Sequence, residues 1–443
     1  MNHTIGELHQ MQSLSLNAKV AMTRERIKGW VENYGEDGVY VSFSGGKDST
    51  VLLHIVREMY PDVKAVFCNT GLEYPEIVKF VKTFPNVDII RPKLSFRQVI
   101  EKYGYPMISK EVAECVYGAR KYLTSIAEDE GSLQTDRQTD RQTDRQTDRR
   151  YSYRLDKLLG RGKYTSTKSG SFSASENMAS NPKMPDNRTG GVEVSDDLPL
   201  QQESSLLTAL LSQDFGKTID NMRVQRMMGI LPRKGMATME TIPSEKDRSA
   251  FSCARYQFFL DAPFEISHMC CNVMKKNPMH TYARRTGRVP ITAQMASESR
   301  LRTQVWLRQG CNAFDAKAPI SNPMAFWFEE DVLEYIYKNN IEICSVYGDV
   351  VKDEEVKGQL DWGDLGIFDI GRPSLHTTGC QRTGCVFCLF GIHREKSPNR
   401  LEKLKETHPK LYEYVMRPES EGGLGYKEKI DWVNEHGNMH ITY

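Results

Sequence analysis

A glycine turn between an apolar strand and an amphipathic helix constrains this chain more than any other feature. The segment reads Val41-Ser-Phe-Ser-Gly-Gly-Lys-Asp-Ser-Thr50. The apolar, β-branched residues 39–43 predict a buried strand, and Gly45 and Gly46 let the backbone reverse closely. A helix is expected to begin near Asp48. Free backbone N–H groups at a helix start behind a glycine turn predict an anion site.

Lys47 adds a positive charge that can reach a phosphate. The spacing is too short for the GxxxxGK[ST] phosphate loop, and a plain strand-to-helix turn is the alternative. The hexapeptide Ser44-Gly-Gly-Lys-Asp-Ser49 resembles the PP-loop of the adenine nucleotide alpha hydrolases. The residues after it resemble the phosphoadenosine phosphosulfate (PAPS) reductase family within them. The resemblance implies a Rossmann-like sheet that holds ATP or an adenylyl sulfate over this turn.

The same resemblance assigns roles within the turn. Lys47 and Asp48 are the expected catalytic residues, with Asp48 positioning Mg²⁺ and pyrophosphate, and Ser49 is expected to cap the helix. Such catalysis is mainly electrostatic and positional. The residues expected to hold the phosphates are Ser44, Gly45, Gly46 and Lys47.

Composition narrows the class of protein. With 443 residues and 39% hydrophobic content, the chain can bury a core for one large or two modest domains. A net charge of +1 gives no global indication of a nucleic-acid or membrane partner. We find no apolar run long enough for a membrane span and no secretory signal. Ten cysteines in that context predict a reducing, cytoplasmic compartment and a role in metal binding, catalysis or burial.

Strand and helix patterns alternate around the turn. A helical pattern over 5–34 is ended by Gly35, a strand is predicted over 63–69, a helix over 76–84 and a strand over 87–90. This alternation predicts an α/β fold with a parallel, Rossmann-like sheet flanked by helices.

The turn after the second predicted strand reads Asn69-Thr-Gly-Leu-Glu-Tyr-Pro-Glu76. It resembles the family's DTG…PE segment near the sugar and base, so Asn69, Thr70 and Gly71 are expected to contact nucleotide. Asn69 replaces the family's acidic residue, which weakens the case for a carboxylate on a ribose hydroxyl. An ordinary polar turn is the alternative.

Residues 128–250 differ in composition from the rest. A Gln-Thr-Asp-Arg unit repeats over 134–149, a basic aromatic stretch follows at 151–164, and 165–202 is rich in Ser, Asn, Pro and Gly. We expect a low-complexity, largely disordered insertion, in which 151–164 is an amphipathic helix or a nucleic-acid contact. The predicted organisation is a PP-loop nucleotide-binding half (1–127), this insertion, a second half of the domain with metal-binding cysteines (251–395) and a C-terminal helical tail (396–443).

Two cysteine groups predict a metal subdomain. Cys270 and Cys271 are adjacent, and Cys385 and Cys388 form a C-x2-C knuckle, which is a strong metal signal. Together they resemble the [4Fe–4S] arrangement of adenylyl sulfate reductases, which implies that these four are the ligands. Four thiolates suit a [4Fe–4S] cluster or a structural zinc. We favour the cluster, because tandem cysteines fit one tetrahedral zinc poorly. Cys380 is left as a substitute ligand or a reactive thiol.

The segment 291–302 resembles the family's contact to sulfate or phosphate. Glu298, Ser299 and Arg302 match it, whereas Met295 stands where the first arginine is expected. Losing that arginine weakens sulfonucleotide binding, because arginine recognises such anions bidentately. Arg300 is a candidate to compensate.

The family's reductases carry a C-terminal nucleophilic cysteine, and in this sequence no cysteine follows Cys388. We therefore expect nucleotide-dependent sulfur chemistry in which ATP adenylates an acceptor and sulfur then replaces AMP, with tRNA or DNA as acceptor. The sulfur or electrons would come from a cysteine desulfurase or a thioredoxin-like reductant. The alternatives are a sulfonucleotide reductase that uses Cys380 and a non-catalytic nucleotide-sensing protein.

Overall fold

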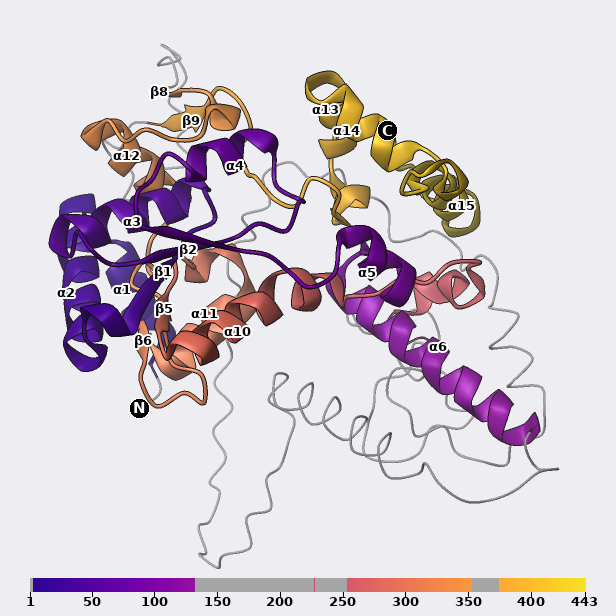
Figure 1. Ribbon diagram of the computed structural model, residues 1–443, viewed down its shortest axis with the longest axis horizontal. Coiled ribbons are helices and arrows are strands. Elements are labelled where there is room, and N and C mark those ends of the chain that lie inside the picture. The colour runs from indigo at the N-terminus through magenta and orange to yellow at the C-terminus, as the bar shows by residue number, and fades with distance from the viewer. Residues whose placement is uncertain (1–2, 132–226, 228–252, 353–373) are drawn as a thin grey trace, which may run out of the picture. The chain divides into compact units, whose positions relative to one another are not determined.

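The computed structural model describes residues 3–131, 227, 253–352 and 374–443 (Figure 1). The expected repeat and the basic aromatic stretch lie outside the described residues and stay predictions. So does the expected disordered insertion (128–250), except for residue 227 and residues 128–131, which are the end of the helix Lys110–Gly131. The chain divides into two compact units, which we describe separately. The first comprises Met1–Ala113, Phe264–Asp431 and His440–Tyr443, and the second comprises Glu114–Pro263 and Trp432–Met439.

A six-stranded sheet in the order β3-β2-β1-β5-β7-β6 forms the centre of the first unit. All neighbouring strands pair in parallel except β6, which is antiparallel to β7 at the edge. The strands are β1 (Val39–Ser42), β2 (Ala65–Cys68), β3 (Val87–Ile90), β5 (Val289–Ile291), β6 (Asn312–Ala313) and β7 (Ile320–Ser321). The α/β, Rossmann-like prediction is therefore confirmed.

The N-terminal helical pattern forms two helices where the sequence predicted one. Helix α1 (Ile5–Gln12) ends before Ser15, and α2 (Leu16–Tyr34) begins after it. The Ser15 hydroxyl accepts the N–H of Ala18, which makes Ser15 an N-cap in the middle of the apolar pattern. Gly35 ends α2 with a positive φ of 76°, as predicted.

Helices cover both faces of the sheet. On one face α2, α3 (Lys47–Met59) and α12 (Glu329–Asn339) pack together, and buried Phe326 and Trp327 precede α12 in the same core. On the other face Tyr282 of α10 (Asn277–Thr286) packs on Tyr40 and Val66.

Two short sheets and further helices complete the first unit. Strand β4 (Met107–Ile108) pairs in parallel with β10 (Leu389–Phe390), and β8 (Val350–Lys352) pairs antiparallel with β9 (Leu375–Thr377). The remaining helices that lie wholly in this unit are α4 (Pro75–Val81), α5 (Phe96–Tyr103), α11 (Arg300–Gln309), α13 (Arg400–Thr407) and α14 (Pro409–Met416).

The second unit contains most of α6 (Lys110–Gly131), the 3₁₀ segment Ala254–Asp261 and the end of α15 (Tyr426–Gly437). Phe258 stacks on Phe259, and both rings contact Trp432 of α15. Every predicted site residue lies in the first unit. Among the described helices of the chain, none is both long and apolar enough to cross a bilayer.

Candidate functional site

The predicted PP-loop is a tight turn between β1 and α3. Gly45 has a positive φ of 71°, and a Cβ there would lie 2.8 Å from the Ile77 side chain of α4. Glycine is therefore required at this position both by conformation and by space. Helix α3 begins at Lys47 with Gly46 as its N-cap, and no side chain caps it.

Ser49 does not cap the helix, contrary to the prediction. Its hydroxyl accepts the N–H of Ser44 (3.2 Å) and donates to the Gly46 carbonyl (2.9 Å). It also lies 3.0 Å from the Ser44 hydroxyl. Because Gly46 already occupies the N-cap position, Ser49 falls inside the first turn and holds the loop closed on itself.

The turn lies at the point where the strand order reverses, between β1 and β5. Open α/β sheets bind ligands in the crevice outside such a point. The segment after β5 supplies the second predicted group. Ser299 caps α11 by accepting the Arg302 N–H (3.3 Å), and Arg302 forms an ion pair with Glu298. Arg302 is also close enough to Asp48 to lower its pKa, so the structure brings the two predicted segments together.

Arg300 stays a candidate to compensate for the missing arginine, but it is not among the charges that act on Asp48. Met295 is only 2% exposed and belongs to the core, while Arg300 is exposed and is not among the charges that shift the pKa of Asp48. Instead, Arg382 acts on Asp48 and Arg302, and its guanidinium lies 3.5 Å from the Glu329 carboxylate. Sequence reasoning missed Arg382, since nothing local relates it to the turn.

The loop 380–383 lies against the PP-loop. The Lys47 ammonium donates to the Gln381 carbonyl (2.6 Å) and pairs with Glu329, the first residue of α12. The Lys47 ammonium also lies 5.7 Å from the centre of the Tyr347 ring, and the Tyr347 hydroxyl bonds the Thr383 hydroxyl at 2.5 Å. Lys47, which would hold phosphate, is thus already bound to other groups of the protein.

Asp48 has an unsatisfied oxygen at the centre of these charges. Its Oδ1 is buried and has no hydrogen-bond partner. Burial raises the pKa of Asp48, and the Glu329 charge raises it further, while Lys47, Arg382 and Arg302 act in the opposite direction. A buried, unpartnered carboxylate oxygen beside a second carboxylate suits a hard cation, because Mg²⁺ is commonly held by one or two carboxylates and substrate phosphates.

The turn after β2 is ordered by its own side chains. The Asn69 amide oxygen accepts the Gly71 N–H (3.1 Å), and Thr70 donates to Glu73 from both its N–H (3.0 Å) and its hydroxyl (2.8 Å). Glu73 in turn lies 3.8 Å from the Lys275 ammonium. Through Glu73 and Lys275, the predicted polar turn therefore contacts the helical segment that follows the tandem cysteines.

Backbone pairing around residues 105–108 brings the two cysteine groups together. Tyr105 bridges Ile266, which lies shortly before Cys270, and β4 pairs with β10, which begins directly after Cys388. Ile108, a β-branched residue at a positive φ of 64°, accepts the Gly391 N–H (2.7 Å). This uncommon conformation is held between the two cysteine segments.

The predicted ligands Cys270, Cys271, Cys385 and Cys388 are close enough to influence one another. Burial raises the pKa of the Cys270 thiol, and the other three thiols raise it further. Burial also raises the pKa of Cys385, while the Lys275 ammonium, which hydrogen-bonds this sulfur, acts to lower it. In the described part of the chain, no three Cys, His, Asp or Glu side chains form a single-ion metal group. The metal centre and its cluster chemistry stay predictions.

Neighbouring helices and loops hold the cysteine segments in position. Cys270 and Cys271 open a continuous helix that passes through a π-helical turn, Asn272–Lys276, before α10, and such turns are frequent at functional sites. On the other side Arg400 donates to the Cys388 carbonyl (2.8 Å), and the Val386 N–H donates to Leu72 in the turn after β2 (2.8 Å).

Cys380 belongs with the nucleotide turn. Its thiol donates to the Arg382 carbonyl (2.9 Å), and its backbone N–H donates to Val346 (2.9 Å). It also acts electrostatically on Tyr347, whose pKa burial raises to about 12. The spacing alone left Cys380 open as a ligand or a reactive thiol, and both stay predictions.

Comparison with known proteins fits this arrangement. The phosphoadenosine phosphosulfate reductase domain matches residues 38–121 and 241–389, more than half of the chain. The chain belongs to the phosphoadenosine phosphosulfate reductase family. The matched ranges contain every predicted site residue and stop just after Cys388.

Individual relatives match over shorter stretches. An adenosine 5'-phosphosulfate reductase of Geobacillus kaustophilus is 27% identical over 112 residues, which is 23% of this chain and 47% of that protein. A phosphoadenosine 5'-phosphosulfate reductase of Xanthomonas campestris is 24% identical over 102 residues, covering 22% and 42%. An uncharacterised protein of Methanocaldococcus jannaschii is 36% identical over 73 residues, covering 15% and 18%. The chain thus spans less than half the length of these relatives.

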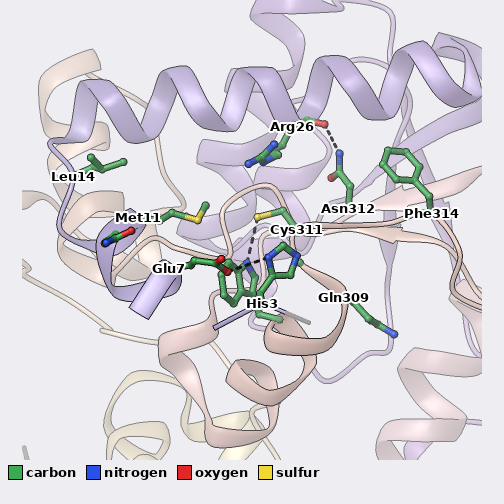
Figure 2. Close-up of a pocket in the computed structure, with 12 residues that line it drawn as sticks. His3, Glu7, Met11, Leu14, Arg26, Gln309, Cys311, Asn312 and Phe314 are labelled. Carbon is green, nitrogen blue, oxygen red and sulfur yellow. Dashed lines mark hydrogen bonds and ion pairs between the residues drawn. The ribbon is translucent and has the colours of Figure 1, made fainter. Parts of the chain in front are cut away.

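A cavity of about 530 Å³ lies apart from the family site (Figure 2). Its walls come from α1, α2, the end of α11 and β6, and they contain none of the predicted site residues. Within it the Trp306 indole N–H donates to the Cys311 thiol (3.4 Å), and Asn312 donates to the Arg26 carbonyl (2.8 Å). The second contact joins α2 to the edge strand β6, and the first joins α11 to the residue before that strand.

Proposed function

We propose that this protein cleaves ATP at the α-phosphate, adenylates a nucleic-acid acceptor and replaces the resulting AMP by sulfur. The observation that carries the proposal is the grouping of two carboxylates with three cations beside the turn that follows β1. Asp48 and Glu329 provide a place for Mg²⁺, and Lys47, Arg302 and Arg382 provide one for a polyphosphate. A magnesium nucleotide needs both kinds of group, whereas an adenylyl sulfate needs only the cations.

The chemistry follows from these positions. An oxygen of the acceptor attacks the α-phosphorus, the bond to the β-phosphate oxygen breaks, and pyrophosphate leaves. A sulfur donor at the oxidation level of hydrosulfide then attacks the acceptor atom that is bonded to the adenylated oxygen. The bond to that oxygen breaks, and AMP leaves with it. Lys47 and the two arginines stabilise the charge that develops on the phosphates, in a site where they are already positioned. Bound Mg²⁺ would neutralise the leaving pyrophosphate.

The cysteine group is proposed to hold a [4Fe–4S] cluster. The mutual proximity of Cys270, Cys271, Cys385 and Cys388 supports this, and a polynuclear cluster does not need three ligands on one ion. When bound, such a cluster supplies electrons or a site for sulfur. The chain's own contribution is the polar connection from Thr70 through Glu73 and Lys275 to Cys385, which ties the nucleotide turn to the cysteines.

The test follows the products of two nucleotides. Anaerobically purified protein is incubated with ATP and Mg²⁺ in the presence of bulk tRNA or DNA, and separately with adenylyl sulfate and a dithiol. We expect AMP and pyrophosphate from ATP, at a rate lost on Lys47→Ala and kept on Lys338→Ala, an exposed lysine of α12. Sulfite from adenylyl sulfate with no cleavage of ATP would overturn the proposal.

The position of Cys380 favours a second candidate, sulfonucleotide reduction. The Cys380 thiolate would attack the sulfur of an adenylyl sulfate, the sulfur–oxygen bond to the phosphate would break, and the nucleotide would leave. A thioredoxin-like dithiol would then reduce the enzyme thiosulfonate and release sulfite. Sulfite release that is abolished by Cys380→Ser but retained by Cys344→Ser would establish this route. Adenylyl sulfate that is left intact would reject it.

A further inference from the structure

Helix α10 carries a run of cations without acidic neighbours in sequence. Residues 275–288 contain five lysines and arginines and no aspartate or glutamate, in a chain whose net charge is only +1. Lys276, His280 and Arg284 follow one another at four-residue intervals and are exposed, as is Arg285. Four residues of helix span about 6 Å, so these side chains form a row along one face.

Among the described residues, four of these five cations form no ion pair. Lys275 pairs with Glu73, but within the described ranges Lys276, Arg284, Arg285 and Arg288 make no salt bridge. Arg288 donates to the Asp37 carbonyl (2.8 Å), and Arg285 lies over the Tyr282 ring. A surface helix normally mixes charges of both signs, so an uncompensated row of one sign is a candidate contact for a polyanion.

The row leads toward the nucleotide site. At one end the Cys68 thiol, at the carboxyl end of β2, donates to the Met274 carbonyl beside Lys276. At the other end Arg288 contacts Asp37, just before β1 begins. Helix α10 (salmon in Figure 1) therefore runs antiparallel to the strands, and Lys276 lies at the sheet edge that carries the PP-loop and the tandem cysteines.

Exposed Arg91 and Lys93 follow a strand that packs against α10. Ile90, the last residue of β3, packs in one small cluster with Met279 and Ala283 of α10. Arg91 and Lys93 follow directly and are exposed. The basic surface is defined as Lys276, directly before α10, with Arg284 and Arg285 of α10. Arg91 and Lys93 lie at the carboxyl end of β3, the strand whose Ile90 packs on this helix.

We propose that this basic surface binds the phosphate backbone of a nucleic-acid strand and directs it along α10 toward the nucleotide site. The proposal rests on the proposed function, in which a nucleic acid is the sulfur acceptor. Phosphate contacts of this kind position a substrate without reading its sequence. An acidic protein is the competing occupant. Among the described residues, α10 carries no exposed large hydrophobic side chain, which a protein interface would require at its centre.

Fluorescence anisotropy with labelled single-stranded oligonucleotides and with tRNA tests the surface. The full chain is compared with Lys276→Gln/Arg284→Gln/Arg285→Gln and with a matched control, Lys403→Gln/Lys405→Gln/Lys410→Gln, which removes three exposed lysines of α13 and α14. Glutamine keeps the helix propensity. We expect the α10 variant to bind at least about tenfold more weakly, with a salt slope smaller by about 2 for single strands, and the control to be nearly unchanged.

Separate readouts distinguish this inference from the proposed function. Calorimetric binding of ATP without nucleic acid reports the nucleotide site alone and should be weakened by Lys47→Ala but unchanged in the α10 triple variant. Equal weakening of both triple variants, or binding of polyglutamate in preference to nucleic acid, would overturn the α10 proposal alone. Nucleic-acid binding through α10 without any cleavage of ATP would overturn the proposed function alone. The single variant Lys276→Gln, with an expected slope change of about 0.7, covers the case in which the triple variant misfolds.

Discussion

Two lysine–carboxylate pairs involve the first turn of the same helix, α12, and they differ in how deeply they are buried. Lys19 of α2 meets Asp331 at 2.5 Å, and both side chains are 0% exposed. Lys47 of the PP-loop meets Glu329, whose side chain is 32% exposed. Chemistry and location are nearly the same, so the difference in burial decides what each pair does.

The Lys19–Asp331 pair is closed. The Asp331 carboxylate also accepts the Phe328 N–H (2.7 Å) at the start of α12. Neither charge has access to water or ligand, so the pair can only stabilise the packing of α2 on α12. The Lys47–Glu329 pair is open on one side, where Arg382 approaches Glu329 and the Gln381 carbonyl approaches Lys47. The Lys47 side chain itself is only 5% exposed, so the pair is open through its carboxylate. In the proposed function a phosphate takes the place of these partners, and the pair holds Lys47 in position for it.

The largest effect is expected from breaking the closed pair. Lys19→Met should lower the free energy of unfolding by about 3–5 kcal/mol, because it leaves the Asp331 charge buried without its partner. Urea denaturation followed by far-UV circular dichroism measures it. The control is Lys338→Met, which removes an exposed lysine paired with Glu334 and should cost less than about 0.5 kcal/mol. Equal losses in the two variants would mean that the closed pair is not structural.

Breaking the open pair should affect activity instead. Lys47→Met should slow cleavage of ATP by about 10²–10³-fold, since a positioned donor to the phosphates is lost. Its free energy of unfolding should change by less than about 1 kcal/mol, because Glu329 keeps Arg382 and solvent. The two quantities are measured on one preparation. A loss of stability as large as that of Lys19→Met would remove the distinction between the pairs.

In each site, the sequence predicted the residues that lie close together in the chain and missed the partners that lie far away in it. The PP-loop, its glycines and its strand were predictable because they follow one another in the chain. The partners of Lys47 were not, since Glu329 and Gln381 are 282 and 334 residues away. Arg382 was missed for the same reason, whereas Arg300 was named as a candidate because it lies within the segment 291–302.

The same limit explains the other corrections. The cysteine groups were recognised from their spacing, but the segment 105–108 that joins them pairs with residues far along the chain on both sides. The break between α1 and α2 was missed because Leu14 and Leu16 continue the apolar pattern through the Ser15 cap. The cap at α3 was assigned to Ser49 because glycine provides no side-chain signal at the true N-cap.

Arg382→Ala tests whether the open pair has a second cation for the phosphates. We expect an increase of about tenfold in the KM for ATP, which corresponds to one charge-assisted contact. Arg300→Ala is the matched control, because its side chain is exposed and exerts no influence on Asp48, and its KM should change less than about twofold. Steady-state kinetics of AMP release gives both values. An effect confined to Arg300→Ala would support the arginine that the sequence named as a candidate.

The smallest and most diagnostic effect is expected from Glu329→Gln. Without Mg²⁺, Glu329 competes with phosphate for Lys47, so its neutralisation should tighten ATP binding by about two- to fivefold, as for a partly exposed pair. The additional gain from Mg²⁺ should be smaller than in the wild type, because one of its two carboxylates is removed. The pH dependence should change as well. Glu329 helps to raise the pKa of Asp48. With the glutamine, Asp48 ionises at lower pH, and the acid limb of the rate profile moves to lower pH.

Calorimetric titration of ATP with and without Mg²⁺, together with a pH–rate profile, measures these effects. Glu334→Gln, on the same helix and paired with the exposed Lys338, serves as the control and should alter neither. Weaker binding of metal-free ATP to Glu329→Gln would mean that Glu329 orients Lys47 and does not compete for it. The open pair would then be a fixed part of the site, and the contrast with Lys19–Asp331 would reduce to exposure alone.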